Sequence, residues 1–144
     1  MNGIYESHSA EETERIGEAL AEHFKASGTK TRTIALRGEM GVGKTAFTRG
    51  FARPFGIRTV KSPTYTVVNE YRGASGWVFH FDMYRIADED ELYAIGFEEY
   101  LSRDGFVLIE WSENVKDALP TDTVTVSIQR TDAADGRSVE ISGI

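Results

Sequence analysis

Three glycines, a lysine and a threonine are spaced within one short segment in a pattern that can hold phosphate groups. The segment runs from Gly38 to Thr45 as Gly-Glu-Met-Gly-Val-Gly-Lys-Thr and matches the P-loop pattern G-x-x-x-x-G-K-[ST]. Glycines let successive backbone N–H groups curve around phosphate oxygens where a Cβ atom would interfere. The lysine then reaches the terminal phosphates, and the threonine hydroxyl binds Mg²⁺. The segment therefore predicts a site for a nucleoside triphosphate.

A strand and a helix must flank this segment to aim it at a ligand. The apolar run Thr33 to Leu36 does not alternate, which is typical of a central strand covered on both faces. Phe47 and Phe51 fall on one face of a helix, which Pro54 is expected to end. A helix that begins at Lys44 would turn its positive dipole end toward phosphate. The residues predicted to contact the nucleotide here are Gly38, Gly41, Val42, Gly43, Lys44, Thr45 and Ala46.

Carboxylates follow two further strand-like segments. Mg²⁺ requires oxygen ligands, and a P-loop protein usually supplies an acidic residue from the end of a neighbouring strand. Glu110 closes the apolar run Phe106 to Ile109 and is the predicted metal ligand. Asp82 lies in the run His80 to Arg85, which suits a hydrogen-bonded structural corner as well as a catalytic group, and spacing does not decide between them. Trp111 either stacks near the nucleotide or packs in the core.

The remaining pattern predicts how the chain surrounds these residues. Ser9 and Glu12 form a capping pair at the start of an amphipathic helix that Gly28 ends. Residues 66–71 and 77–82 predict one hairpin, residues 124–128 and 139–141 a closing one, and two short acidic helices follow Asp88. The fold class predicted is α/β, a P-loop NTPase-like central sheet flanked by helices with antiparallel hairpins, in one domain of residues 1–144.

Composition and charge narrow the classes of function. The chain is 40% hydrophobic and 27% charged, has no cysteine, and shows neither a secretory signal nor an apolar run long enough to span a bilayer. We therefore expect a cytoplasmic protein without disulfides or membrane contact. The formal net charge of −7 disfavours direct nucleic-acid binding by the chain alone. The basic residues that follow the P-loop form either a local patch or a solvated face, and they are Arg49, Arg53, Arg58 and Lys61.

The absence of one motif indicates which base the bound nucleotide carries. GTPases of the Ras type read guanine with an Asn-Lys-x-Asp segment, which this sequence lacks. The nearest string, Asn114-Val115-Lys116-Asp117, has the wrong order. The sequence therefore favours ATP with Mg²⁺ as the ligand.

Four segments in order resemble the bacterial TsaE family, formerly called YjeE. They are the P-loop of residues 38–45, the segment Ser62-Pro63-Thr64-Tyr65-Thr66, the run His-Phe-Asp-Met-Tyr-Arg of residues 80–85, and Ile109-Glu110-Trp111. Their order and spacing also match those of the family, and the resemblance covers nearly the whole chain. Four motifs in order are a far more specific signal than a P-loop alone.

The resemblance implies an ATPase that works with a TsaD–TsaB heterodimer in making the threonylcarbamoyladenosine modification of tRNA. A protein of this family does not itself transfer the threonylcarbamoyl group. ATP binding and hydrolysis would instead regulate or reset the partner complex between cycles. This role is compatible with a small acidic domain that lacks a tRNA-binding surface of its own.

The resemblance also implies roles for individual residues. Gly41 to Thr45 would hold the phosphates, and Thr45 and Glu110 would bind Mg²⁺ directly or through water. Asp82 would complete the metal site. Thr64 would lie in a loop like the first switch of other P-loop proteins, where a threonine senses the γ-phosphate. The predicted catalytic groups are Lys44, Asp82 and Glu110.

The base would lie between the two ends of the chain. The resemblance places it near Ser9 to Glu11 and near the turn of Gly136 and Arg137, where Arg137 covers the base or points into solvent. Pro54 departs from the family pattern, in which the helix after the P-loop runs on to the glycine that is Gly56 here. We therefore expect a shortened helix and an intact site.

Three hypotheses of function follow. The first is a weak ATPase that its partners stimulate. The second is a binding module that ATP switches, with hydrolysis incidental. The third is a small-molecule kinase, which would need arginine-bearing lid residues that the sequence does not show.

Overall fold

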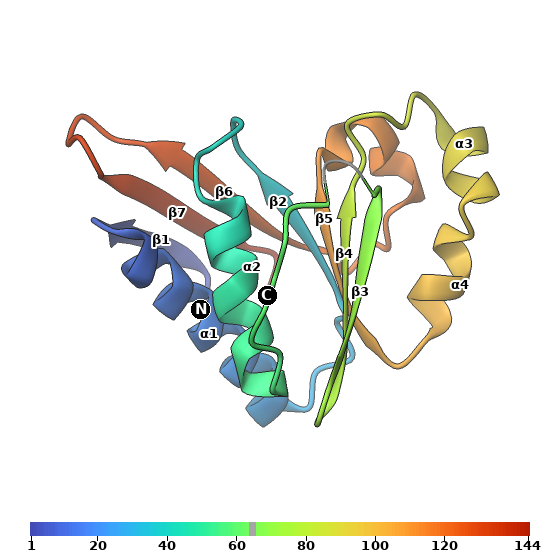
Figure 1. Ribbon diagram of the computed structural model, residues 1–144, viewed down its shortest axis with the longest axis horizontal. Coiled ribbons are helices and arrows are strands. Elements are labelled where there is room, and N and C mark those ends of the chain that lie inside the picture. The colour runs from blue at the N-terminus through green and yellow to red at the C-terminus, as the bar shows by residue number, and fades with distance from the viewer. Residues whose placement is uncertain (64–65) are drawn as a thin grey trace.

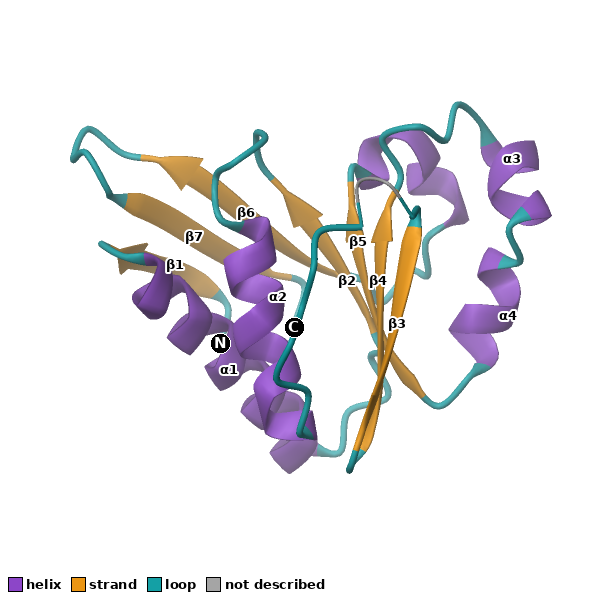
Figure 2. Cartoon of the chain, viewed as in Figure 1, coloured by secondary structure: helices purple, strands orange, loops and turns teal. Residues whose placement is uncertain are grey.

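A computed structural model describes residues 1–63 and 66–144 and shows a single sheet with helices on both faces (Figures 1 and 2). The strands are β1 (Gly3–Ser7), β2 (Thr33–Arg37), β3 (Val68–Gly73), β4 (Gly76–Asp82), β5 (Gly105–Glu110), β6 (Val124–Arg130) and β7 (Arg137–Ser142). The helices are α1 (Ala10–Ser27), α2 (Lys44–Ala52), α3 (Glu89–Ala94) and α4 (Phe97–Ser102), with 3₁₀ segments η1 (Arg53–Phe55) and η2 (Ser112–Ala118).

The sheet has a parallel centre and antiparallel edges. Its strand order is β1-β7-β6-β2-β5-β4-β3. β2 pairs in parallel with β5 and β6, and β5 pairs in parallel with β4. The predicted hairpins are confirmed as β3–β4 and β6–β7. This arrangement confirms the α/β prediction and turns the carboxyl ends of β2, β4 and β5 to the same edge.

Side-chain alternation along β5 builds a core on each face of the sheet. Phe106 and Leu108 pack in the cluster that contains the apolar residues of α1 and α2. Val107 and Ile109 pack in the cluster that contains those of α3 and α4. Successive residues of a strand point to opposite faces, so a strand covered on both sides is apolar throughout. Every residue of β5 is buried, including Glu110.

The first helix begins and ends as the sequence predicts. The Ser9 side chain accepts a hydrogen bond of 3.1 Å from the backbone N–H of Glu12. The Glu12 carboxylate accepts from the N–H of His8, one residue before the cap, at 2.6 Å. Gly28 ends the helix in the left-handed conformation with φ of 64°. The cap fixes the start of α1, which becomes part of a cavity described below.

The helix after the glycine-rich loop is short, as expected. α2 ends at Ala52, and a 3₁₀ turn that includes Pro54 follows it. Proline has no N–H to continue the helical ladder and its ring crowds the preceding turn. Gly56, with φ of 86°, closes the segment.

Two elements at the sheet edges differ from the prediction. β1 was not predicted, because its exposed Ile4 and inward Tyr5 give no clear alternation in so short a strand. β3 begins at Val68, two residues later than predicted, because Val67 adopts a left-handed φ of 68°. The N–H groups of Thr66 and Val67 both bond to the carbonyl of Pro63, so these residues form a turn instead of a strand.

Two glycines let α1 and α2 approach until their backbones touch. A Cβ atom added to Gly50 would lie 1.8 Å from the carbonyl oxygen of Glu14, and one added to Gly17 would lie 2.2 Å from that of Phe47. Real Cβ atoms do not approach backbone oxygens so closely, so only glycine fits at either position. The contact fixes the N-terminal half of α1 against α2, which begins directly after the glycine-rich loop.

A surface cluster fastens α4 to the edge of the sheet. Arg103 donates to the Glu70 carboxylate at 2.8 Å, and the Tyr100 hydroxyl donates to it at 3.0 Å. The Arg103 guanidinium also lies 4.5 Å from the ring centre of Phe79. The hydrogen bond from Arg103 lowers the pKa of Glu70, and burial together with Glu70 raises the pKa of Tyr100.

The lowered pKa of Glu70 predicts a small pH dependence of stability. A carboxyl whose pKa is lower in the folded state stabilises above its ordinary pKa, and this contribution is lost as the pH falls through the folded-state value. We expect Glu70→Gln to lower the free energy of unfolding by at most about 1 kcal/mol at pH 7, since both partners are more than one-third exposed. Urea unfolding of both proteins should converge below pH 4. A difference that grows in acid would contradict the assignment, and Glu98→Gln on the exposed side of α4 is the control.

Candidate functional site

The glycine-rich loop connects β2 to α2 with its backbone turned inward. Gly41 and Gly43 have φ angles of 75° and 120°, values that residues with a side chain rarely adopt. Among the described residues no side chain caps the N-terminus of α2 at Gly43. The first N–H groups of the helix therefore remain available, and together with the helix dipole they suit an anion.

Two arginines at the end of the β6–β7 hairpin hold the outer side of the loop. Arg130 and Arg137 are cross-strand partners. Arg130 bonds to the Glu39 carboxylate at 3.0 Å and to the carbonyl of Met40 at 3.3 Å. Arg137 donates to the carbonyl of Val42 at 2.8 Å. These bonds satisfy outward carbonyls of the loop, and Arg130, which belongs to no motif, was not singled out from the sequence.

A cavity of about 350 Å³, here called the carboxylate cavity, opens beside the loop at the carboxyl edge of the sheet. It brings together Lys44, Thr45, Asp82, Glu110 and Trp111, all of which the sequence analysis selects. Asp82 and Glu110 are register partners in the parallel pair β4–β5, so their side chains lie side by side. The other lining residues are Met40, Gly41, Gly43, Ser62, Tyr84 and Arg85.

Lys44 and Glu110 are buried together at the back of the carboxylate cavity, each 6% exposed. The Lys44 amine donates to the carbonyl of Gly38 at 2.6 Å and lies 3.8 Å from Glu110 Oε1. The same amine lies 4.5 Å from the ring centre of Trp111, which is half-buried. The other carboxylate oxygen, Oε2, lies 2.5 Å from His80 Nε2. The lysine is thus held inside the protein by a carbonyl, a carboxylate and a ring.

Asp82 is both a structural corner and a wall of the cavity. Its Oδ1 accepts from the N–H of Tyr84 at 2.9 Å, which fixes the turn after β4. Its own N–H donates to the carbonyl of Val67 at 2.8 Å. The carboxylate is 6% exposed and lines the carboxylate cavity beside Glu110. The structural corner is therefore confirmed, and the position of the carboxylate at the cavity leaves the catalytic role a prediction.

The donor set of this cavity fits Mg²⁺ in the way P-loop proteins bind it. Mg²⁺ prefers six oxygen ligands and usually takes one or two carboxylates, with water and phosphate oxygens in the other positions. Thr45, Asp82 and Glu110 offer a hydroxyl and two carboxylates around one space. In the part of the chain that the structure describes, no three His, Cys, Asp or Glu residues are grouped to hold a metal ion by themselves.

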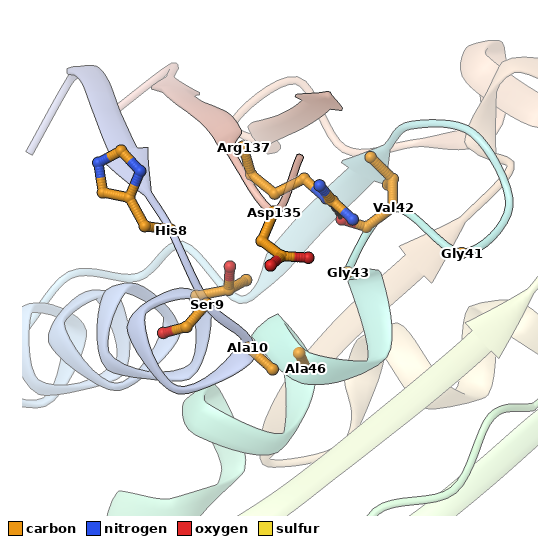
Figure 3. A pocket seen from close by; sticks show the side chains of 10 residues that line it. His8, Ser9, Ala10, Gly41, Val42, Gly43, Ala46, Asp135 and Arg137 are labelled. Carbon is orange, nitrogen blue, oxygen red and sulfur yellow. Dashed lines mark hydrogen bonds between the residues drawn. The ribbon is translucent and has the colours of Figure 1, made fainter. Parts of the chain in front are cut away.

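A second cavity, of about 390 Å³ and here called the α1 cavity, lies on the other side of the loop (Figure 3). Gly41 and Gly43 line both cavities, so the two spaces adjoin at the loop. In Figure 3 the side chains of Asp135 and Arg137 reach toward Val42 and Gly43, whereas the ring of His8 turns away. The lining residues are His8, Ser9, Ala10, Thr13, Gly41, Val42, Gly43, Ala46, Asp135 and Arg137.

One residue predicted at this end lies elsewhere. Ser9 and Arg137 line the α1 cavity, whereas Glu11 is exposed and lines neither cavity. Positions three apart share a helix face, so Ala10 and Thr13 take the place expected for Glu11. Glu11 directly follows Ala10 in the helix, so its side chain points to a different face of α1.

The predicted switch residue, Thr64, lies outside the described residues. Its neighbour Ser62 lines the carboxylate cavity.

Two of the basic residues that follow the P-loop form ion pairs with α1. Arg49 pairs with Glu14 at 2.8 Å and Arg53 pairs with Glu18 at 3.4 Å. Carboxylates of α1 therefore neutralise the charges of two of the four basic residues.

Comparison with known proteins decides the family. The family model "Threonylcarbamoyl adenosine biosynthesis protein TsaE" matches residues 7–139. The chain belongs to the TsaE family. A TsaE protein of Haemophilus influenzae is 41% identical over 129 residues, which are 88% of this chain and 80% of that protein. A TsaE protein of Bacillus subtilis is 38% identical over 121 residues, which are 83% of this chain and 73% of that protein.

The fold agrees with that of a solved structure. The crystal structure of YdiB from Bacillus subtilis has a TM-score of 0.77 and 26% sequence identity, and the match covers 100% of this chain and 87% of that chain. The α/β fold predicted from the sequence is confirmed, as is the resemblance to the TsaE family. No helix in the described part of this TsaE-family chain is long and apolar enough to cross a membrane.

Proposed function

We propose that the chain binds ATP with Mg²⁺ and serves the threonylcarbamoyladenosine modification of tRNA, the process for which its relatives are named. In this proposal it is a weak ATPase that a TsaD–TsaB heterodimer stimulates. One observation carries the proposal. The loop amides, Lys44 and the two carboxylates border two cavities that share Gly41 and Gly43, so a single extended ligand can occupy both.

The phosphates would lie against the loop, with the base toward α1. The N–H groups of residues 41–45 and the start of α2 would bind the phosphate oxygens. Ala10, Thr13 and Arg137 would border the base in the α1 cavity, where a hydroxyl and a guanidinium stand beside an apolar methyl. The missing guanine motif favours adenine at this end.

The residues of the carboxylate cavity would act on the terminal phosphate. Lys44 would exchange the carbonyl of Gly38 for phosphate oxygens, which are stronger acceptors for a cation. Thr45 and Glu110 would hold Mg²⁺, which neutralises phosphate charge when bound. Asp82, fixed by the N–H of Tyr84, would orient water beside the ion.

The mouth of the carboxylate cavity supports control by a partner. Met40 and Tyr84 line it and are 70% and 59% exposed, among the most exposed large apolar side chains of the described residues. Exposed apolar groups at one rim are typical of a surface that another protein covers. A TsaD–TsaB heterodimer on this rim would exclude bulk solvent while retaining the attacking water that Asp82 orients, and so raise the rate.

A substitution at Glu110 tests the catalytic proposal. We expect Glu110→Ala to reduce partner-stimulated phosphate release by about 100-fold or more, because the carboxylate that holds the metal is lost. The measurement is phosphate release with ATP, Mg²⁺ and the TsaD–TsaB heterodimer, alongside tRNA modification by the same mixture. Glu113→Ala is the matched control, since Glu113 is exposed just beyond the same strand and pairs only loosely with Arg37.

The same variant also tests the alternative in which ATP acts as a switch and hydrolysis is not required. That alternative is favoured by the bond from Asp82 N–H to the carbonyl of Val67, which connects the carboxylate cavity to the residue just before β3. Val67 has a left-handed φ of 68°, which is costly for a β-branched residue and can store about 1–3 kcal/mol. If Glu110→Ala binds ATP, joins the heterodimer and still supports tRNA modification, the switch is correct and the catalytic proposal is wrong.

A further inference from the structure

His80 is a buried polar side chain that the proposed mechanism does not yet use. It is 0% exposed and lies in β4 between Phe79 and Phe81. Because side chains alternate along a strand, His80 shares its face with Asp82, while the two phenylalanines belong to the core on the opposite face. Among the described residues its hydrogen-bond partner is Glu110, through the contact of 2.5 Å from Nε2 to Oε2.

The proposed metal role of Glu110 assigns the donor in this contact. A carboxylate that binds a metal ion only accepts hydrogen bonds, so in the proposed site Nε2 carries the hydrogen that it shares with Glu110. The other ring nitrogen, Nδ1, has no hydrogen-bond partner among the described residues. A buried polar atom without a partner is costly and calls for an explanation. His80 therefore contributes one directed bond to Glu110 at the cost of an unpaired nitrogen.

We propose that His80 is a positioning residue that sets the rotation of the Glu110 carboxylate for Mg²⁺. By holding Oε2, it leaves Oε1 on the side of Lys44 and the carboxylate cavity. Oε1 is then the oxygen offered to the ion. This proposal rests on the proposed function, because it assigns a partner to the metal ligand of the same site.

A purely structural role explains the histidine poorly. An apolar side chain of similar size would fill the same buried space without leaving a polar atom such as Nδ1 unpaired. Carboxylates that bind metals are themselves hydrogen-bonded, and loss of such a partner typically lowers metal affinity or activity 10- to 100-fold. The cost of burying His80 is therefore offset by the orientation that it gives to Glu110.

Three substitutions of His80 separate orientation from packing. His80→Leu removes the donor and keeps the volume roughly constant. His80→Gln keeps an N–H at about the reach of Nε2, whereas His80→Asn is shorter by one methylene and falls short of Glu110. The Gln and Asn pair carries the test even if the leucine variant does not fold, because both of its members are polar.

The test is calorimetric titration of ATP into the full chain, in EDTA and over a series of Mg²⁺ concentrations. We expect His80→Leu and His80→Asn to raise the Mg²⁺ concentration for half-maximal enhancement of ATP binding about 10- to 100-fold. Their ATP affinity in EDTA should equal that of the unsubstituted protein, and His80→Gln should recover most of the lost Mg²⁺ response.

Each outcome supports or contradicts the proposal. If the unsubstituted protein binds MgATP and the Asn variant needs no more Mg²⁺ than the Gln variant, His80 does not position Glu110. Equal loss of ATP affinity in EDTA and in Mg²⁺ would assign His80 a packing role and also overturn the proposal. If the unsubstituted protein itself shows no Mg²⁺-dependent ATP binding, the proposed function fails first and the inference fails with it.

Discussion

Replacement of Lys44 by alanine is expected to weaken MgATP binding about 100-fold and to abolish measurable hydrolysis. Lys44 is 6% exposed, and its amine lies between the Gly38 carbonyl and Glu110, where the terminal phosphates would arrive. A hydrogen bond that involves a charged group contributes about 1.5–3 kcal/mol, and two such bonds to the phosphates would be lost. Since about 1.4 kcal/mol corresponds to a factor of ten, a 100-fold loss is the lower expectation.

Two assays measure this effect. One is calorimetry of MgATP binding, and the other is phosphate release in the presence of the TsaD–TsaB heterodimer. Lys30→Ala is the control, because Lys30 is exposed before β2, at the opposite edge of the sheet from the loop. Circular dichroism must accompany both variants, since Lys44→Ala also leaves the buried Glu110 without its cationic neighbour. Unchanged ATP affinity in a folded Lys44→Ala protein would refute the phosphate assignment.

Gly50→Ala is expected to reduce the free energy of unfolding by about 3 kcal/mol, although alanine is the better helix former. In an open helix the exchange would stabilise by roughly 0.5–1 kcal/mol. Here the new Cβ atom would lie 1.8 Å from the Glu14 carbonyl oxygen and 2.5 Å from its carbonyl carbon. Backbone atoms cannot yield as a flexible side chain does, so α1 and α2 must separate. Overpacking of this kind costs about 1–3 kcal/mol and occasionally more.

Thermal and urea unfolding measure the loss, which at a few degrees per kcal/mol corresponds to a fall in Tm of about 10 °C. Gly28→Ala is the matched control. Gly28 has a φ of 64° but nothing within 4 Å of an added Cβ, so this variant reports backbone strain without overlap. Its expected cost is about 1 kcal/mol. If the two variants lose equal stability, the close approach of the helices does not matter.

The helix contact also connects stability to ligand binding. Thr13 on α1 and Ala46 on α2 both line the α1 cavity, and the glycines at positions 17 and 50 set their separation. A Gly50→Ala protein that still folds should therefore bind ATP more weakly than the Gly28→Ala protein. The phosphate end of the site, built within one loop, should be affected less.

Local sequence pattern was sufficient to predict much of this structure. The loop of residues 38–45, the cap at Ser9, the break at Pro54 and the apolar run of β5 each follow from residues close together in the sequence. Backbone geometry and side-chain alternation act over a few residues, so their signals survive without tertiary contacts. The position of Glu110 beside the loop followed because carboxyl ends of parallel strands meet at one edge.

Contacts between side chains that are distant in the sequence could not be predicted from local pattern. His80 and Glu110 are 30 residues apart, and Arg137 and the carbonyl of Val42 are 95 apart. Their contacts depend on the strand order and on rotamers fixed by packing, which no local pattern encodes. For the same reason the sequence did not indicate that Ala10 and Thr13, and not Glu11, line the α1 cavity. The face that α1 presents to this cavity is set by its glycine contact with α2. Residues that are neighbours in the sequence therefore predict the P-loop with its strand and helix, and the packing of α1, β4 and the β6–β7 hairpin around them builds the rest of the candidate site.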